Sequence, residues 1–345
     1  MLHNLKLFFF YIARAFGLFA IAKHLTAMSP RILCYHGGSL GDEWQYNGLL
    51  FMRRTTFAKR IDWLERNGFK FISLDQAIGN PSSDRSNCPS VVLTFDDGWY
   101  STGRELLSLL AENNIPSVLY LSTNYFQEGH SIIPVALGYL LWKSEKREFQ
   151  FNDIDVDIDG TYDTRIPSER NRLISAITHW ASTKSSDKQE VTKLIEKVAA
   201  HLDVPIDTLA LETRRFDYLN AEEISFFSKN GCAIELHGHL HHYPVGEPGK
   251  FEQDLDLCTK VIRELQLAKP KHYCYPGGVF DSAAAGILMR RGVISATTCL
   301  PGLMNFRRPS DNYYLPRFLD GEQIHMLEFE AEMSGFTALL RYARV

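Results

Sequence analysis

The sequence has no long uninterrupted apolar run, no strong excess of charge and no paired-cysteine motif. Its longest apolar stretch, 7–22, is interrupted by Arg14 and is shorter than the ~20 residues that span a bilayer. The net charge of −4 gives no reason to expect a nucleic-acid partner. Six scattered cysteines without a CxxC pair, and no Asn-x-Ser/Thr acceptor site, argue against a disulfide framework and favour a reducing compartment.

Residues 1–30 are expected to form an apolar, amphipathic N-terminal helix. In one interpretation the helix lies at a membrane surface, with Lys6, Arg14 and Lys23 reaching the headgroups. In the other it docks on the core of the protein itself. A weakly basic start without a clean cleavage site disfavours a signal peptide, although secretion stays open. We therefore expect a cytoplasmic protein, with peripheral contact at a bacterial inner membrane as an alternative.

From residue 31 onward, short β-rich runs alternate with helical patterns. The strand candidates are 31–35, 69–74, 91–95, 117–122, 232–236, 272–275 and 293–298. Strands that alternate with helices predict a parallel sheet with right-handed crossovers, and about seven such units suggest a closed or nearly closed α/β barrel. We expect one barrel domain over 31–345, carrying a helical and hairpin insertion at about 142–219.

The insertion contains an acidic run that imitates a calcium-binding loop. Asp155, Asp157 and Asp159 alternate with apolar residues, and Ile166 stands where the loop would need its bidentate glutamate. Alternation is typical of a strand with one solvated face. We therefore predict a strand here and no calcium site.

Two adjacent carboxylates, Asp96 and Asp97, follow the buried run VVLTF over 91–95. Burying an unpaired charge is costly, so acids at this place need a partner or a chemical role. Neighbouring strand residues point to opposite faces, so both carboxylates can reach one site only where the strand ends and Gly98 relaxes the backbone. The structural alternative is a helix-capping Asp beside a solvent-exposed Asp.

Four histidines within six residues follow another strand candidate, 232–236. His237 and His241 are the only pair spaced four apart, so one helical turn would present both imidazoles on one face. Two histidine nitrogens and a carboxylate, with one position left open to water, suit a divalent metal. The sequence therefore predicts a metal site where the acid pair and the histidines meet.

The motif TFDDG over 94–98, followed by a histidine pair after a strand, resembles the polysaccharide deacetylase family, carbohydrate esterase family 4. The resemblance extends from about residue 31 onward and includes ILCYHGG at 32–38, CYPGG at 274–278 and LPR at 315–317. It matches the branch with YPxG in the third motif. The family implies a distorted (β/α)7–8 barrel that removes acetyl groups from polysaccharides with a divalent metal, chiefly Zn2+, with Co2+, Ni2+ or Mn2+ as alternatives.

Carried over position by position, the resemblance assigns Asp96 as the general base. Asp97, His237 and His241 become the metal ligands. Gly277 falls where the family uses a backbone N–H to hold the oxyanion. These five positions come from two distant stretches of sequence and the CYPGG motif.

The sequence departs from the family pattern at several positions. Cys274 stands at the place of the third-motif arginine that pairs with the base, so Arg317 is expected to replace it. Gly238 stands where Thr or Ser usually follows the first histidine. The late L-x-L-H motif has no clear match, which leaves His36 and His325 as candidates for the general acid.

The leading hypothesis is a metal-dependent hydrolase that removes an N-acetyl or other acyl group from an amino sugar of a polysaccharide or lipid-linked glycan. Its partner would be that acetylated glycan or glycolipid. The long insertion favours a large or lipid-linked substrate. Two alternatives remain: a catalytically silent carbohydrate-binding barrel, which the missing L-x-L-H motif favours, and a hydrolase of smaller amides.

Overall fold

The computed structural model describes residues 2–79, 88–128, 132–150, 161–184, 188–304 and 309–343. Its centre is a sheet of eight described strands, all parallel, in the order β11-β10-β9-β6-β5-β1-β12, with β4 also pairing with β5. The strands are β1 Arg31–Tyr35, β4 Lys70–Phe71, β5 Ser90–Asp97, β6 Ser117–Leu121, β9 Cys232–Leu236, β10 His272–Cys274, β11 Ser295–Thr297 and β12 Phe318–Leu319.

The sheet curls into the distorted barrel that the sequence predicted. One segment touches both ends of the strand order: Leu315 bridges Thr297 in β11, and Phe318 pairs with Leu33 in β1. Each of the seven predicted strands corresponds to a strand of this sheet. The two-residue strand β12 was not predicted, because so short a segment carries no alternating pattern.

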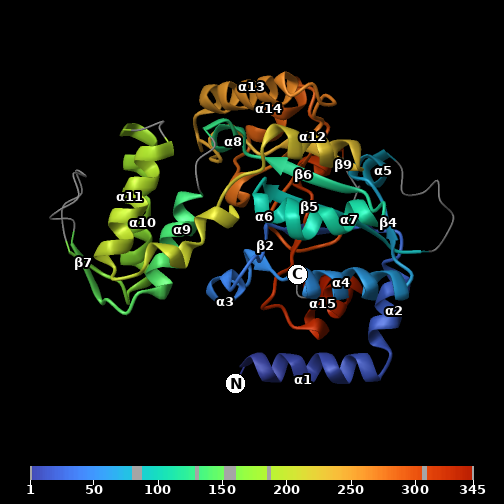
Figure 1. The fold of residues 1–345 in the computed structure, drawn as a ribbon. Coiled ribbons are helices and arrows are strands. Elements are labelled where there is room, and N and C mark those ends of the chain that lie inside the picture. The colour runs from blue at the N-terminus through green and yellow to red at the C-terminus, as the bar shows by residue number, and fades with distance from the viewer. Residues whose placement is uncertain are drawn as a thin grey trace.

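Helices cover the outside of the curled sheet (Figure 1). Apolar side chains from the sheet and from most of these helices form the largest buried cluster, which spans residues 33 to 333. The helices are α4 Arg54–Arg66, α5 Leu74–Gly79, α6 Tyr100–Thr102, α7 Ser108–Glu112, α8 Thr123–Glu128, α12 Ala221–Lys229, α13 Pro248–Glu264, α14 Ala284–Arg290, α15 Met326–Met333 and α16 Phe336–Tyr342, with a π-helical turn at Gly103–Leu107 between α6 and α7.

A second lobe, with its own apolar cluster, stands beside the carboxyl ends of β5 and β6 (Figure 1). It contains the predicted insertion 142–219, but its cluster also takes in the helix upstream, α9. The acidic run at 155–159 lies outside the described residues. The lobe comprises α9 Ile133–Lys143, β7 Glu148–Gln150, β8 Thr161–Asp163, α10 Pro167–Lys184, α11 Lys188–His201 and short 3-10 turns at Ile206–Leu209 and Leu211–Thr213.

The connection from β1 to the first barrel helix packs against this lobe. It holds β2 Gly37–Gly38, which pairs in parallel with β3 Phe51–Met52, and the short helix α3 Glu43–Tyr46 between them. Arg215, from the lobe's return segment, donates hydrogen bonds to Glu43 over 2.6 Å and Asp42 over 3.0 Å. One buried and one partly buried charge pair therefore fix the lobe to the loop beside the strand ends.

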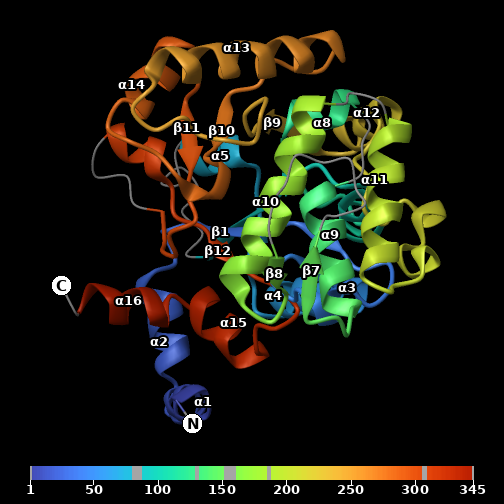
Figure 2. The same cartoon turned by 90° about the vertical axis from the view of Figure 1, so that its left-hand side faces the viewer.

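The N-terminal residues form two helices, α1 Leu2–Ala15 and α2 Leu18–Leu25, below α4 and α15 (Figures 1 and 2). Phe10 and Phe19 pack in a buried cluster with Phe336 of α16. Among the described residues no single helix is long and apolar enough to cross a membrane. Together α1 and α2, bent by 77°, meet the criteria of length and composition. Part of this segment thus docks on the protein, as one of the two interpretations expected.

Candidate metal centre

Asp96 and Asp97 are the last two residues of β5 and are both buried. Asp97 has a left-handed backbone with φ of 74°, and Gly98 follows with φ of 95°. A Cβ on Gly98 would lie 2.5 Å from the Leu121 side chain, so only glycine fits here. The turn at the strand end lets successive acids serve one site. The capping alternative is wrong, because Trp99 holds the N-cap position of α6.

Three side chains converge on one point at the strand ends. The Asp97 Oδ1 atom lies 3.3 Å from His237 Nε2 and 3.0 Å from His241 Nε2. The three ligand atoms all lie within 4.8 Å of one another. Two imidazole nitrogens and one carboxylate oxygen are a donor set that Zn2+ and related divalent ions accept.

The state of the Asp97 carboxylate fits a cation at this point. Its Oδ1 atom is buried and makes no hydrogen bond with the described residues unless the neighbouring Nε2 atoms of His237 and His241 are protonated. An unpaired buried carboxylate oxygen is costly unless a cation balances it. Burial alone would raise the pKa of Asp97, but the imidazoles of His241 and His237 hold it well below its ordinary value. The acid is therefore ionised and available as a ligand.

His237 is oriented by a second hydrogen bond. Its Nδ1 atom lies 2.9 Å from the backbone oxygen of Cys274, which fixes the ring so that Nε2 faces Asp97. Burial lowers the pKa of His237, but Asp97 and Asp96 together raise it above the ordinary value. Protons therefore compete with a metal cation for the Nε2 atom of His237.

The two metal-site histidines do not share a helical turn, so that expectation is wrong. Residues 237–241 form a loop in which Gly238 and His241 have left-handed φ values of 76° and 52°. Asp254 of α13 organises the loop, because its carboxylate accepts hydrogen bonds of 2.8 Å from the backbone N–H groups of His239 and Leu240. The rings of His237 and His241 come together because the loop contains left-handed residues, and not because they lie one helical turn apart.

Asp254 also explains one departure from the family pattern. A Cβ on Gly238 would lie only 3.0 Å from the Asp254 Oδ2 atom, in a backbone conformation that disfavours any side chain. Glycine thus replaces the usual hydroxyl residue for steric reasons. Sequence reasoning missed Asp254, although an acid beside the apolar stripe of Phe251 and Leu255 was a signal for it.

Asp96 forms a bidentate ion pair with Arg317, as the resemblance implied. Arg317 Nη1 lies 2.7 Å from Oδ1 and Nη2 lies 2.8 Å from Oδ2, with both side chains buried. Burial alone would raise the pKa of Asp96, but the Arg317 guanidinium holds it well below its ordinary range. Arg317 reaches this position from the segment just before β12, on the far side of β1.

Two thiols complete the surroundings of Asp96. Cys34 Sγ and Cys274 Sγ lie 3.5 Å and 3.6 Å from Asp96 Oδ2. Arg317 Nη2 also lies 3.0 Å from Cys274 Sγ. Cys274 therefore leaves room for the guanidinium that approaches from another strand, at the position where the family motif has an arginine.

The two candidate acids lie in different places. His36, just after β1, has its Nε2 atom 4.0 Å from Asp96 Oδ2. Its Nδ1 atom is buried and finds no partner in the described structure. His325 instead caps α15, where its Nδ1 accepts a hydrogen bond from the Leu327 N–H. The structure thus brings His36, and not His325, to the acid pair.

Gly277 lies at the same rim, after β10. It has a left-handed φ of 60° in the short turn Pro276–Gly278. Pro276 comes within 3.7 Å of the position that a Cβ on Gly238 would occupy. The turn Pro276–Gly278 therefore borders the histidine loop. The left-handed conformation of Gly277 changes the chain direction next to the candidate metal ligands.

An aromatic wall borders the site on the side of the lobe, and sequence reasoning did not identify it. The rings of Tyr125 and Tyr218 stack 5.6 Å apart, and Tyr125 lies edge-on to His241 at 6.5 Å. Trp99 forms a backbone bridge with Tyr218 and lies 6.0 Å from the His36 ring. Isolated aromatic residues in three separate segments gave no signal in the sequence.

Comparison with known proteins agrees with this geometry. The family model described as polysaccharide deacetylase matches residues 83–158, the segment that contains the acid pair. Over this segment the chain is similar to the polysaccharide deacetylase family. No curated protein sequence matches it.

Solved deacetylase structures share the fold over almost their whole length. IcaB from Ammonifex degensii is 16% identical with a TM-score of 0.53, over 89% of this chain and 97% of the other. The Streptococcus pyogenes deacetylase PplD in complex with acetate is 12% identical with a TM-score of 0.56, over 88% and 98%. A de-N-acetylase from Aggregatibacter actinomycetemcomitans is 14% identical with a TM-score of 0.54, over 88% and 99%. At these identities the likeness is one of fold.

Proposed function

We propose that the chain is a metal-dependent hydrolase that removes an acetyl group from an amino sugar of a polysaccharide or lipid-linked glycan. The observation that carries this proposal is the buried group of Asp97, His237 and His241 beside the ion pair of Asp96 with Arg317. A ligand set with an unpaired carboxylate oxygen and a neighbouring ionised acid are the parts that hydrolysis of an amide needs.

The metal ligands and the base have separate tasks. A divalent cation, Zn2+ foremost, supplies Lewis-acid polarisation of the acyl carbonyl and makes water more acidic. Asp97, His237 and His241 would hold it. Asp96 accepts the proton of the attacking water, and Arg317 keeps Asp96 ionised by binding both of its oxygens.

The remaining groups act on the tetrahedral intermediate and the leaving amine. The Gly277 N–H donates to the developing oxyanion, a contribution of about 3 kcal/mol for one well-placed donor. His36 gives a proton to the leaving amine. Burial lowers the pKa of His36, so its protonated form is a stronger acid than a free imidazolium.

Tyr125, the partly exposed ring of the aromatic wall, supports a sugar substrate, whereas Tyr218 and Trp99 are buried. Aromatic rings pack against the apolar faces of pyranose rings, and Tyr125 lies directly beside His241. The lobe extends the same side of the site (Figure 2). A substrate larger than one sugar would contact the wall and the lobe together, which favours a glycan chain or a glycolipid over a small amide.

Acetate release from N-acetylglucosamine oligomers tests the proposal, with the protein loaded with Zn2+ or Co2+. Asp97→Ala should lose bound metal and turnover, whereas Asp96→Asn should keep metal and lose turnover. Asp256→Asn serves as a control, because this exposed α13 acid forms an ion pair with Arg291 at the surface. It should change neither metal content nor rate.

The alternatives give different results in the same assay. A silent binding barrel would bind the oligomers without releasing acetate at any metal loading. A hydrolase of smaller amides would act on a panel of simple amides and leave the oligomers intact. Retention of metal in Asp97→Ala together with its loss in Asp96→Asn would contradict the assigned roles.

A further inference from the structure

Helices α1 and α2 carry an exposed apolar surface that the deacetylase site does not use. Of the 21 large apolar side chains exposed in the described part of the chain, ten lie between Leu5 and Met28. Only a narrow stripe that includes Phe10 and Ala13 is buried against α15 and α16. A helix that is apolar on nearly all sides is stable in water only when something covers it.

The charges around this surface indicate which kind of partner it would bind. Residues 1–30 contain no acid, and their bases include Lys6 and Arg14. Two ion pairs, Lys6–Glu328 and Arg14–Glu330, connect the surface to α15, and a third, Arg341–Glu332, joins α16 to α15 beside it. In all three the glutamate side chain is 10–14% exposed and its cationic partner 37–55%. The cations are therefore the outermost charges, positioned for an anionic surface.

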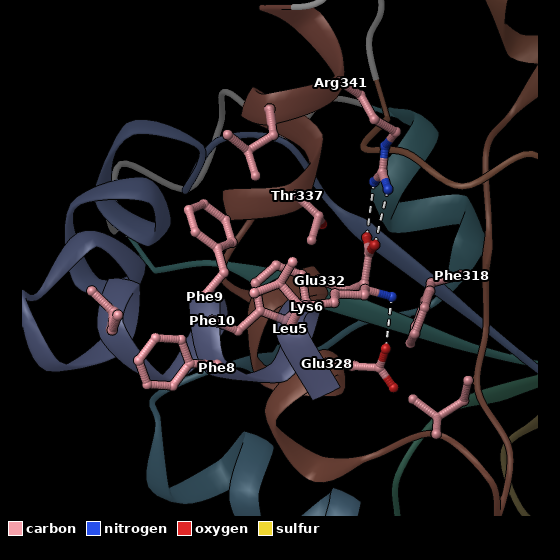
Figure 3. A pocket seen from close by; sticks show the side chains of 13 residues that line it. Leu5, Lys6, Phe8, Phe9, Phe10, Phe318, Glu328, Glu332, Thr337 and Arg341 are labelled. Carbon is pink, nitrogen blue, oxygen red and sulfur yellow. Dashed lines mark hydrogen bonds and ion pairs between the residues drawn. The ribbon is translucent and has the colours of Figure 1, made fainter. Parts of the chain in front are cut away.

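A cavity of about 760 Å³ opens beside the same surface, between α1 and α15–α16 (Figure 3). Leu5, Phe8 and Phe9 line it from α1, and Phe318 lines it from β12. Thr337 of α16, which is nine-tenths buried, also lines the cavity. The volume is in the range of small-ligand sites, and the mostly apolar lining suits an acyl chain.

We propose that the α1–α2 surface docks on a bilayer that contains anionic phospholipids, with the apolar side chains in the interface and the cavity open to an acyl chain. Phe8, Phe9 and Phe16 enter between the headgroups, while Lys6 and Arg14 contact lipid phosphates. A second copy of the chain is the competing occupant. The arrangement of cations outside and acids beneath disfavours it, because two such faces would bring like charges together.

Vesicle flotation of the full chain tests the proposal. The chain should float with phosphatidylcholine vesicles containing phosphatidylglycerol, and less with phosphatidylcholine alone or at high salt. Phe8→Glu and Phe16→Glu should each lower the bound fraction about tenfold or more, because each places a charge where an aromatic ring would be buried.

The matched control is Phe226→Glu on α12, far from α1 in Figures 1 and 2. Phe226 is 55% exposed and Phe8 61%, so both changes put an acid at a similar surface position. The control should float like the unmodified chain. No flotation of the unmodified chain, or flotation insensitive to Phe8→Glu and Phe16→Glu, would overturn the proposal. The proposal would also be overturned if the chain did not bind vesicles but formed a dimer, seen by light scattering, that Phe8→Glu and Phe16→Glu abolish.

A fluorescence measurement keeps the test independent of acidic substitutions. The five tryptophans all lie outside residues 1–30, so Phe16→Trp is a conservative probe at an exposed position. Vesicles should enhance and blue-shift the emission added by Phe16→Trp, and lipids brominated on their acyl chains should quench it. Emission that stays water-like in the presence of anionic vesicles would refute the proposed insertion.

Discussion

Replacing Arg317 with methionine should both destabilise the fold and remove the base. Arg317→Met introduces an uncharged side chain of similar length. It leaves Asp96 buried without the guanidinium that lies 2.7 and 2.8 Å from its two oxygens. Removing one member of a buried ion pair costs about 3–5 kcal/mol. That is a large part of the about 5–15 kcal/mol by which domains are stable.

The pH dependence of stability should change sign. In the unmodified chain the pKa of Asp96 is held low by Arg317, so its stabilising contribution is present above the ordinary pKa of aspartate and is lost as pH falls through the lowered value. In Arg317→Met burial dominates and raises the pKa of Asp96. Stability should then decrease as pH rises through that raised value.

Urea unfolding at several pH values, with acetate release in parallel, measures both effects. Arg341→Met is the matched control: Arg341 binds Glu332 with two hydrogen bonds of 2.9 and 2.8 Å, but the pair is partly exposed. It should cost about 1 kcal/mol or less. Arg317→Lys should restore part of the stability but little turnover, because a single ammonium nitrogen cannot form the two parallel hydrogen bonds of the guanidinium. Equal stability and turnover in Arg317→Met and the unmodified chain would refute the reasoning.

Three further predictions concern the histidines and their loop. Gly238→Ala should lower the free energy of unfolding by about 2–3 kcal/mol and weaken zinc binding. Gly246→Ala is the control, because Gly246 has nearly the same φ but open space around it, and should lower that free energy by about 1 kcal/mol. Calorimetry and zinc titration measure the two effects, and equal losses in both variants would contradict the role of the Asp254 contact. His36→Ala should lower kcat about 10²–10⁴-fold, while His325→Ala should leave kcat unchanged and lower the unfolding free energy by about 1 kcal/mol; equal effects on kcat would contradict the assignment. Zinc affinity, measured against a chromophoric chelator, should fall between about pH 8 and pH 5, because the raised pKa of His237 favours the protonated imidazole as pH falls; a constant affinity would contradict this linkage.

Much of the barrel could be predicted from the sequence because its strands are buried apolar runs bounded by turn residues. The structure places the acid pair and the histidines at neighbouring strand ends, since β5 and β9 both pair with β6. The conformation of the histidine loop could not be predicted, because four-residue spacing suits a helical turn as well as a loop with left-handed residues at Gly238 and His241. Asp254, which holds that loop, lies on the next helix, α13, 15 residues after His239, and only the folded structure shows that its carboxylate turns back to the loop.

The position of Arg317 connects closure of the barrel with its chemistry. The backbone N–H of Arg317 donates a hydrogen bond to the Leu300 carbonyl. Arg317 lies two residues after Leu315, which bridges β11, and one residue before Phe318, which pairs with β1. Its side chain crosses the interior to Asp96 on β5. The guanidinium can therefore reach the carboxylate only when this segment lies between both ends of the sheet. The same ion pair that keeps the base ionised thus stabilises the closed arrangement of the barrel, so a substitution that loosens the 315–319 segment should lower turnover without contacting the substrate.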